Sequence, residues 1–296
     1  MRSTRRRNWL LVPLGITTAI LLAACTPQEQ AGFLPQGEAF GEGAVTNHTD
    51  RITGLWTTSW TVLLIVGLIT WGLLLWSLIV YRRRRGQTGL PVQMRYNMPI
   101  EFLYTVIPVI LIIGFFAFTA RDINAIESEP AGGSDIHISA FGKQWSWDFN
   151  YIDEDVHIAG IQAQYGPDGF IDGQNVPTLV LPVDKSVQLD LEARDVIHSF
   201  WVPDFLYKKD MIPGKSNVMY FTPTKEGSYL GKCAELCGEY HAQMLFKVDV
   251  VSEAEYEEFI ATLKADPGSQ GILGHDYDRN QNFPQDGIHS LEDADR

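Results

Sequence analysis

The sequence predicts a two-helix transmembrane hairpin followed by an all-β external domain, a β-sandwich or barrel. Two long apolar runs fall within the first 120 residues, and short stretches that alternate between apolar and polar residues follow them. The chain has a net charge of −13. Its acidic residues lie mainly after Arg121, in the predicted external domain. Such an acidic surface repels nucleic acid and favours a basic partner, so we expect no nucleic-acid binding.

The N-terminus predicts export. Arginines within residues 2–7 precede an apolar run over 10–24 that is too short to span a bilayer comfortably, so residues 1–24 are predicted to be a signal peptide. The run ends in Leu22-Ala-Ala-Cys25, which resembles a bacterial lipobox and predicts that Cys25 is lipidated. An ordinary signal peptide that contains a cysteine is the alternative. Residues 25–52 are polar and rich in Gly, Pro and Gln, and are predicted to be an external linker.

Residues 53–120 are predicted to form the hairpin in membrane lipid. The stretch 56–80 is uncharged and would give about 37 Å of helix, enough to cross a hydrocarbon core of about 30 Å. Four arginines follow at 82–85, and such a run marks the cytoplasmic side. The second span, 98–120, returns to the outside, so the domain beyond it is external.

Glu101 is the one charged residue in the second span. An ionisable group at membrane depth is costly and is a functional candidate. It also lies near the cytoplasmic end of the span, so a carboxylate that simply reaches the aqueous interface is the alternative.

The external domain is predicted over residues 121–265. Stretches with strand character, bounded by Gly and Pro, lie at 135–141, 179–181, 186–192, 217–222 and 245–251. A short helix is predicted over 252–264, because Ser252 can cap it and two glutamates occupy its first turn. The segment 151–177 is interpreted as a long loop and 266–296 as a polar tail, and both are expected to touch partner subunits.

A cluster of soft metal ligands follows the fourth of these stretches. Cys233, Cys237, His241 and Met244 lie within 12 residues, and His198 lies upstream beside Asp195. Two thiols, two imidazoles and a thioether suit copper better than a hard cation. A disulfide between the cysteines, a structural zinc site and a mononuclear copper site are the alternatives. Two thiolates that bridge two copper ions would use every ligand of the set.

The spacing C-x-E-x-C-x-x-x-H-x-x-M resembles the CuA signature of cytochrome c oxidase subunit 2, and the resemblance extends from the two spans to the short helix after Val251. It implies a cupredoxin-like domain in which Cys233 and Cys237 bridge two copper ions. It further implies His198 and Met244 on one copper, and His241 and the Glu235 carbonyl on the other. The Glu235 carboxylate resembles the family's ligand to a magnesium ion shared with subunit 1.

Two further roles follow from the same resemblance. The stretch Gln144-Trp145-Ser146-Trp147 is similar to the family segment whose tryptophan receives the electron, which makes Trp145 the candidate; packing at the membrane interface is the alternative. Lys143 and Ser146 stand where many members have His and Tyr, which leaves details of donor docking open. Glu101 resembles the glutamate at the mouth of a proton pathway into subunit 1.

The resemblance therefore implies a subunit of a bacterial, proton-pumping oxidase of the cell membrane. It would accept electrons from a c-type cytochrome and pass them to haem in subunit 1, where oxygen is reduced to water. A quinol oxidase subunit would lack the copper ligands, and a membrane-tethered copper chaperone is the alternative of a different class. The lipobox and the acidic domain suggest an actinobacterial type, in which the donor belongs to a cytochrome bc complex.

Overall fold

A computed structural model describes residues 43–90, 93–167, 171 and 176–276 of the chain. The predicted signal peptide, Cys25 and the end of the polar tail lie outside these described residues.

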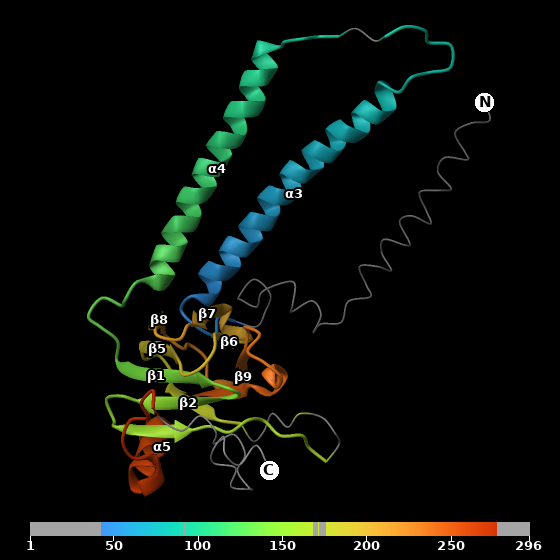
Figure 1. Ribbon diagram of the computed structural model, residues 1–296. Coiled ribbons are helices and arrows are strands. Elements are labelled where there is room, and N and C mark those ends of the chain that lie inside the picture. Colours follow the sequence, from blue (N-terminus) through green and yellow to red (C-terminus); the bar gives the residue numbers. More distant parts are fainter. Residues whose placement is uncertain (1–42, 91–92, 168–170, 172–175, 277–296) are drawn as a thin grey trace, which may run out of the picture. The chain divides into compact units, whose positions relative to one another are not determined.

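The predicted hairpin is present as two long helices, α3 (Thr49–Val80) and α4 (Met98–Glu127) (Figure 1). Both are long and apolar enough to cross a membrane, with mean hydropathies of 2.5 and 2.3. Their Leu, Ile, Phe and Trp side chains are largely exposed, as expected for helices that face lipid. α4 continues seven residues past the predicted end, because Asp122 and Ile126 are buried on its last turns.

An ion cluster joins the two helices at their external ends. The carboxylate of Asp122 is buried and accepts hydrogen bonds from Arg51 of α3 at 2.9 Å and from Arg121 of α4 at 3.0 Å. Pairing with two guanidinium groups offsets the cost of burying this carboxylate. Through Arg51 the cluster links α3 to α4 where the external domain begins.

The last residues of the predicted 25–52 linker are part of the folded domain, which corrects that expectation. Val45 and Thr46 are buried, and Thr46 forms a β-bridge with Pro223. The backbone N–H of Asn47 donates to Thr222 O at 3.0 Å, and a ring nitrogen of His48 bonds Tyr220 O at 2.9 Å. These contacts span more than 170 residues, so local sequence pattern could not reveal them.

The external domain is a sandwich of two five-stranded sheets, which confirms the predicted all-β, cupredoxin-like class. The first sheet has the order β3-β2-β1-β5-β8, and its strands are β1 (Ile136–Lys143), β2 (Ser146–Tyr151), β3 (Val156–Ala159), β5 (Val187–Ala193) and β8 (Asn217–Phe221). The second has the order β4-β10-β9-β6-β7, with β4 (Thr178–Pro182), β6 (His198–Val202), β7 (Tyr207–Met211), β9 (Gly227–Cys233) and β10 (Leu245–Val251). Pairing is antiparallel except between β1 and β5 and between β4 and β10.

The five predicted stretches correspond to β1, β4, β5, β8 and β10, and β5 shows the expected alternation of buried and half-buried residues. β3 lies within the segment 151–177, so the expectation of an uninterrupted loop is wrong there. With only four residues, β3 is too short for alternation to distinguish it from a loop.

Aromatic side chains from both sheets form the core beside the metal-ligand loop. Trp147 of β2 is fully buried, and its ring lies 5.8 Å from Phe200 of β6 and 4.8 Å from Phe246 of β10. Burial of such rings dominates core stability, and their mutual contacts fix the spacing of the two sheets. The core thus provides a rigid base for the loops at this end of the sandwich.

The predicted short helix is α5 (Glu253–Ala265), and Ser252 and Glu255 form its capping box. The polar tail, however, begins as part of the domain. Leu273 is buried, and its backbone N–H and C=O both bond the side chain of Asn150 at 3.0 Å. Gln270 forms a β-bridge with Val156 of β3. The first residues of the predicted tail, up to 273, therefore pack on the domain.

Candidate metal centre

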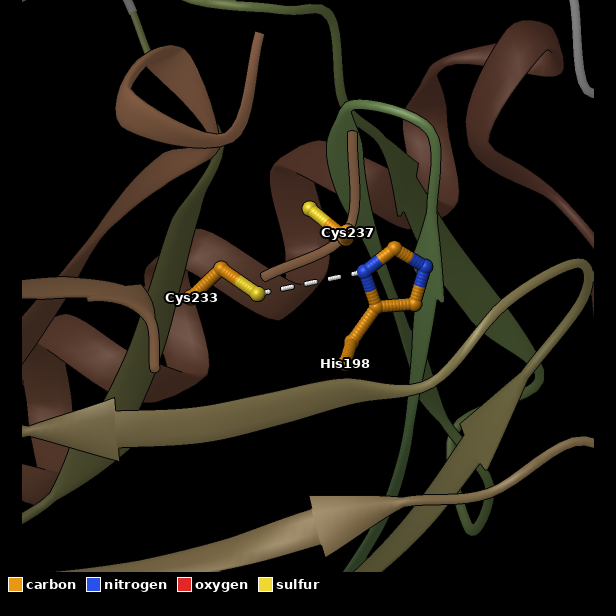
Figure 2. A group of neighbouring side chains, drawn as sticks. All are labelled: His198, Cys233 and Cys237. Atoms are coloured by element: carbon orange, nitrogen blue, oxygen red, sulfur yellow. Dashed lines mark hydrogen bonds between the residues drawn. The ribbon is translucent and has the colours of Figure 1, made fainter. Parts of the chain in front are cut away.

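The candidate ligands are brought together at one end of the second sheet. His198 begins β6 and Cys233 ends the neighbouring strand β9, whose register pairs Cys233 with Phe200. The chain then turns through Cys237 into a short 3₁₀ helix, η3 (His241–Gln243), and Met244 directly precedes β10. Figure 2 shows His198 and the two cysteines pointing toward one another from these separate segments.

The ligand atoms of His198, Cys233 and Cys237 lie within 4.8 Å of one another. The Cys233 sulfur is 3.9 Å from His198 Nδ1 (Figure 2) and 3.1 Å from the carbonyl oxygen of Glu235. The Cys237 sulfur is 3.5 Å from His241 Nδ1 and 3.6 Å from Met244 Sδ. Every group of the predicted set therefore adjoins one of the two sulfurs.

The donor set fits a soft metal. Both thiols are free, and Cys233, Cys237, His198 and Met244 are 5, 3, 0 and 0 % exposed. Thiolate, imidazole and thioether groups in a site shielded from water are the ligands that copper prefers. His241 is only half-buried, so the site approaches solvent on that side.

The protonation of the cysteine pair also suits metal binding. The hydrogen bond with Cys237 lowers the pKa of the Cys233 thiol to about 4, against the effect of burial, and hydrogen bonds with His198 and the backbone act in the same direction. The pKa of Cys237 is raised, since its thiol donates to the neighbouring thiolate. One cysteine is thus a thiolate at neutral pH, and the thiolate is the form that binds metal.

Asp195 orients His198. Its Oδ1 lies 2.8 Å from His198 Nε2, and its carboxylate also accepts hydrogen bonds from the backbone N–H groups of Gln144 and Val196 at 2.7 Å. Burial disfavours the imidazolium, yet the hydrogen bond with Asp195 raises the pKa of His198 above its usual value. With the Nε2 proton donated to Asp195, Nδ1 is free to bind a metal. No role was predicted for Asp195, although its Asp-x-x-His spacing with His198 is a signal for this contact.

Trp145 and Trp147 occupy different environments. Trp147 is in the core, and its indole N–H donates to Met244 O at 3.3 Å. Trp145 is half-buried in the turn between β1 and β2, and its ring contacts Tyr240 edge-on at 4.9 Å. The neighbouring Gln144 donates its side-chain N–H to Cys237 O at 2.7 Å, so this turn is tied directly to the cysteine loop.

Gly142 leaves room for His198. A Cβ atom at Gly142 would lie 2.9 to 3.1 Å from three carbon atoms of the His198 side chain. We expect Gly142→Ala to displace the imidazole and to lower the free energy of unfolding by about 1–3 kcal/mol, as overpacking does. Chemical denaturation measures this loss.

Gly268→Ala is the control for Gly142→Ala, because its new Cβ would make only ordinary contacts, 3.5 Å from the Asp266 carboxylate. Equal stability of the two alanine variants would contradict the role of Gly142.

Glu235 meets this group through its carbonyl and not its carboxylate, and Glu101 lies apart from it, on α4. The Glu235 side chain is exposed while its carbonyl faces the sulfur of Cys233. Glu101 lies near the start of α4, where its carboxylate accepts the Asn97 N–H at 2.9 Å and the Asn97 side chain accepts the Ile100 N–H. This reciprocal pair caps the helix. The structure thus shows a structural role for Glu101 beside the predicted functional one.

Known proteins resemble the chain over most of its length. The family described as "Cytochrome C oxidase subunit II, periplasmic domain" matches residues 136–251. The chain is 39% identical to the "Probable cytochrome c oxidase subunit 2" of Streptomyces avermitilis, over 92% of each chain. It is 30% identical to cytochrome c oxidase subunit 2 of Mycobacterium tuberculosis, over 82% of this chain and 78% of the relative.

Among solved structures, the periplasmic domain of subunit II of cytochrome oxidase from Bradyrhizobium japonicum is 34% identical. It aligns with a TM-score of 0.41, covering 47% of this chain and 98% of that one.

Proposed function

Because the chain belongs to the cytochrome c oxidase subunit 2 family, we propose that it accepts electrons from a c-type cytochrome at a dinuclear copper centre and passes them to haem in subunit 1. Oxygen is reduced to water there, with proton pumping. Membership of the family makes the chain a component of a haem–copper oxidase and implies a copper centre. The observation that carries the proposal is the convergence of two free thiols with two imidazoles and a buried thioether.

In the proposed centre Cys233 and Cys237 would hold two copper ions between them, His198 and Met244 would serve one ion, and His241 and the Glu235 carbonyl would serve the other. Bound copper supplies a one-electron redox couple. Asp195 holds His198 in the tautomer that presents Nδ1, and the buried position of the sulfurs excludes water. A site fixed in this way needs little rearrangement when the oxidation state changes. A copper chaperone would favour exposed, exchangeable ligands, which these are not.

Trp145 is the residue through which we propose that the electron arrives. It is half-buried in the turn between β1 and β2, so part of its ring can meet a donor. The hydrogen bond from Gln144 to Cys237 O provides a short covalent and hydrogen-bonded connection from this turn to the cysteine loop. The acidic composition of the domain suits a basic cytochrome.

The exposed Glu235 carboxylate supports its proposed role as a ligand to a magnesium ion shared with subunit 1. One residue would then serve two metals, since its carbonyl faces the Cys233 sulfur and its side chain is exposed to solvent. Hard Mg²⁺ prefers such a carboxylate oxygen.

The two membrane-capable helices and the family identity indicate a membrane protein with a periplasmic domain. We further place it in the bacterial cell membrane, with the copper domain external, residues 1–24 as signal peptide and Cys25 as the lipidated residue. Relatives from Streptomyces and Mycobacterium support an actinobacterial type, in which the donor belongs to a cytochrome bc complex.

Glu101 is proposed to take up protons at the cytoplasmic end of α4. Glu101→Gln keeps an acceptor for the Asn97 N–H but cannot carry a proton. We expect oxygen consumption by the purified oxidase to fall about tenfold or more, because general acid–base groups contribute factors of this size or larger. Normal turnover in Glu101→Gln, together with slow turnover in Asn97→Ala, would show that the residue acts as a helix cap only.

The proposed function is tested on the intact oxidase complex purified with this chain. Copper analysis is expected to show two copper ions in this subunit, and the oxidised complex should be purple with a near-infrared band. Anaerobic addition of a reduced c-type cytochrome should bleach that band. A colourless subunit that holds only Cu(I), or one that holds zinc, would contradict the proposal.

A further inference from the structure

The segment that follows β3 reaches across to the cysteine loop through a pair of buried amides. Gln162 is 3 % exposed and Gln243 is 5 % exposed, and Gln162 Nε2 donates a hydrogen bond to Gln243 Oε1. The backbone of the same two segments is also joined, because the N–H of Ala163 donates to Gln243 O at 3.3 Å. Gln243 is thus held both at its side chain and at its carbonyl by residues about 80 positions earlier in the chain.

Gln243 lies between two proposed copper ligands. It ends η3, which begins at His241, and Met244 follows it directly. Met244 is fixed from its other side, since its carbonyl accepts the N–H of Cys233 at 3.0 Å and the indole N–H of Trp147 at 3.3 Å. The contact with Gln162 therefore restrains η3 at Gln243, the residue before Met244.

Burying this pair of amides costs free energy, and packing alone does not account for their presence in the interior. Within the described part of the chain, Gln162 Oε1 is buried and has no hydrogen-bond partner. A buried polar atom without a partner costs about 1–3 kcal/mol, and two apolar side chains of similar volume would avoid the cost. A directional contact that sets the position of the η3 turn accounts for the presence of two glutamines here.

We propose that Gln162 is a positioning residue for the metal centre, which acts through Gln243 to hold His241 and Met244 at the cysteine sulfurs. The proposal rests on the proposed function for the identity of the metal. It gives the segment 160–165 a role inside the subunit, in addition to the predicted contact with partners. Loss of the contact would loosen the turn, so that copper is bound less tightly and in an altered geometry.

Three variants of the full chain, purified in the oxidase complex, test this role. Gln162→Leu and Gln243→Leu each break the amide contact, and the double variant removes both amides so that no buried polar partner is left behind. Gln188→Leu is the matched control, because the Gln188 side chain donates to Asp190 Oδ1 at 3.0 Å on the same strand, β5, which belongs to the other sheet. The readouts are the near-infrared band, the rate of copper loss to a Cu(I) chelator under reducing conditions, and the stability of the metal-free protein.

We expect both single variants to shift the near-infrared band and to release copper about 10- to 100-fold faster than Gln188→Leu, the usual effect of losing a contact behind a metal ligand. The double variant should recover metal-free stability, because no amide is orphaned, yet still release copper fast. Release at the wild-type rate in both single variants, or release that recovers together with stability in the double variant, would overturn the proposal.

Two outcomes are kept distinct by these measurements. Absence of the near-infrared band from the wild-type complex would refute the copper function itself, whereas a normal band that is insensitive to Gln162 would refute the positioning role alone. If the leucine variants do not accumulate, Gln162→Asn shortens the side chain by one methylene and is judged by the same readouts and criteria.

Discussion

Cys233→Ser is expected to abolish the purple and near-infrared absorption of the purified complex and to remove copper from this subunit. The serine hydroxyl is not ionised at neutral pH and is a hard donor, whereas the Cys233 sulfur is the thiolate of the pair, with a pKa lowered to about 4. The same sulfur lies near both His198 Nδ1 and the Glu235 carbonyl, so its loss separates two further donors from the site.

Absorption spectroscopy and copper analysis of the purified oxidase measure this effect. Ala234→Ser is the control, because it adds a hydroxyl at the neighbouring, half-buried position and leaves both sulfurs in place. A Cys233→Ser complex with full copper content and an unchanged spectrum would exclude the bridging role.

Trp145→Ala is expected to lower turnover driven by a c-type cytochrome by about 100-fold, comparable to the cost of misplacing reacting groups by about 1 Å. The half-buried Trp145 ring packs on Tyr240. The preceding residue, Gln144, donates a hydrogen bond to Cys237 O. The copper ligands do not include Trp145, so the near-infrared band should persist.

Steady-state oxygen consumption with the cytochrome, compared with a small soluble electron donor, checks this prediction. The small donor should support a much larger share of wild-type turnover in Trp145→Ala, because it does not need the docking surface. Leu230→Ala removes another exposed apolar side chain of the domain, on β9, and should leave the rate with the cytochrome unchanged. Equal rates for Trp145→Ala and wild type with the cytochrome would contradict the role.

The sequence could predict those parts of the fold that have a periodic or continuous apolar pattern. The two apolar runs and the alternating stretches at β1, β5 and β8 carry their own periodicity, and the cap of α5 is encoded in four adjacent residues. The contacts of residues 45–48 and 270–273 with the domain depend on partners more than 100 positions away. No local period records such contacts, so these segments were interpreted as a linker and a tail.

The candidate site shows the same division. Most of its ligands lie in one motif, residues 233–244, and His198 could be predicted because its imidazole suits the same metal. The structure brings them together because β6, β9 and β10 are neighbours in one sheet. The residues that position the ligands could not be found in this way. Gly142 matters because it lacks a side chain, and Gln162 because of one contact made across the fold. The sequence alone shows neither the close approach of His198 to Gly142 nor the contact between Gln162 and Gln243.

The two terminal segments of the domain have a consequence for assembly. β3 and β8 are the outermost strands of the first sheet, and such strands readily recruit strands of other molecules. Gln270 forms a β-bridge with Val156 of β3, and Thr46 and Asn47 bond the chain just beyond β8, so the protein's own backbone contacts the sheet beside both of its outer strands. These contacts occupy backbone groups beside the outer strands that would otherwise be open to strands of other molecules.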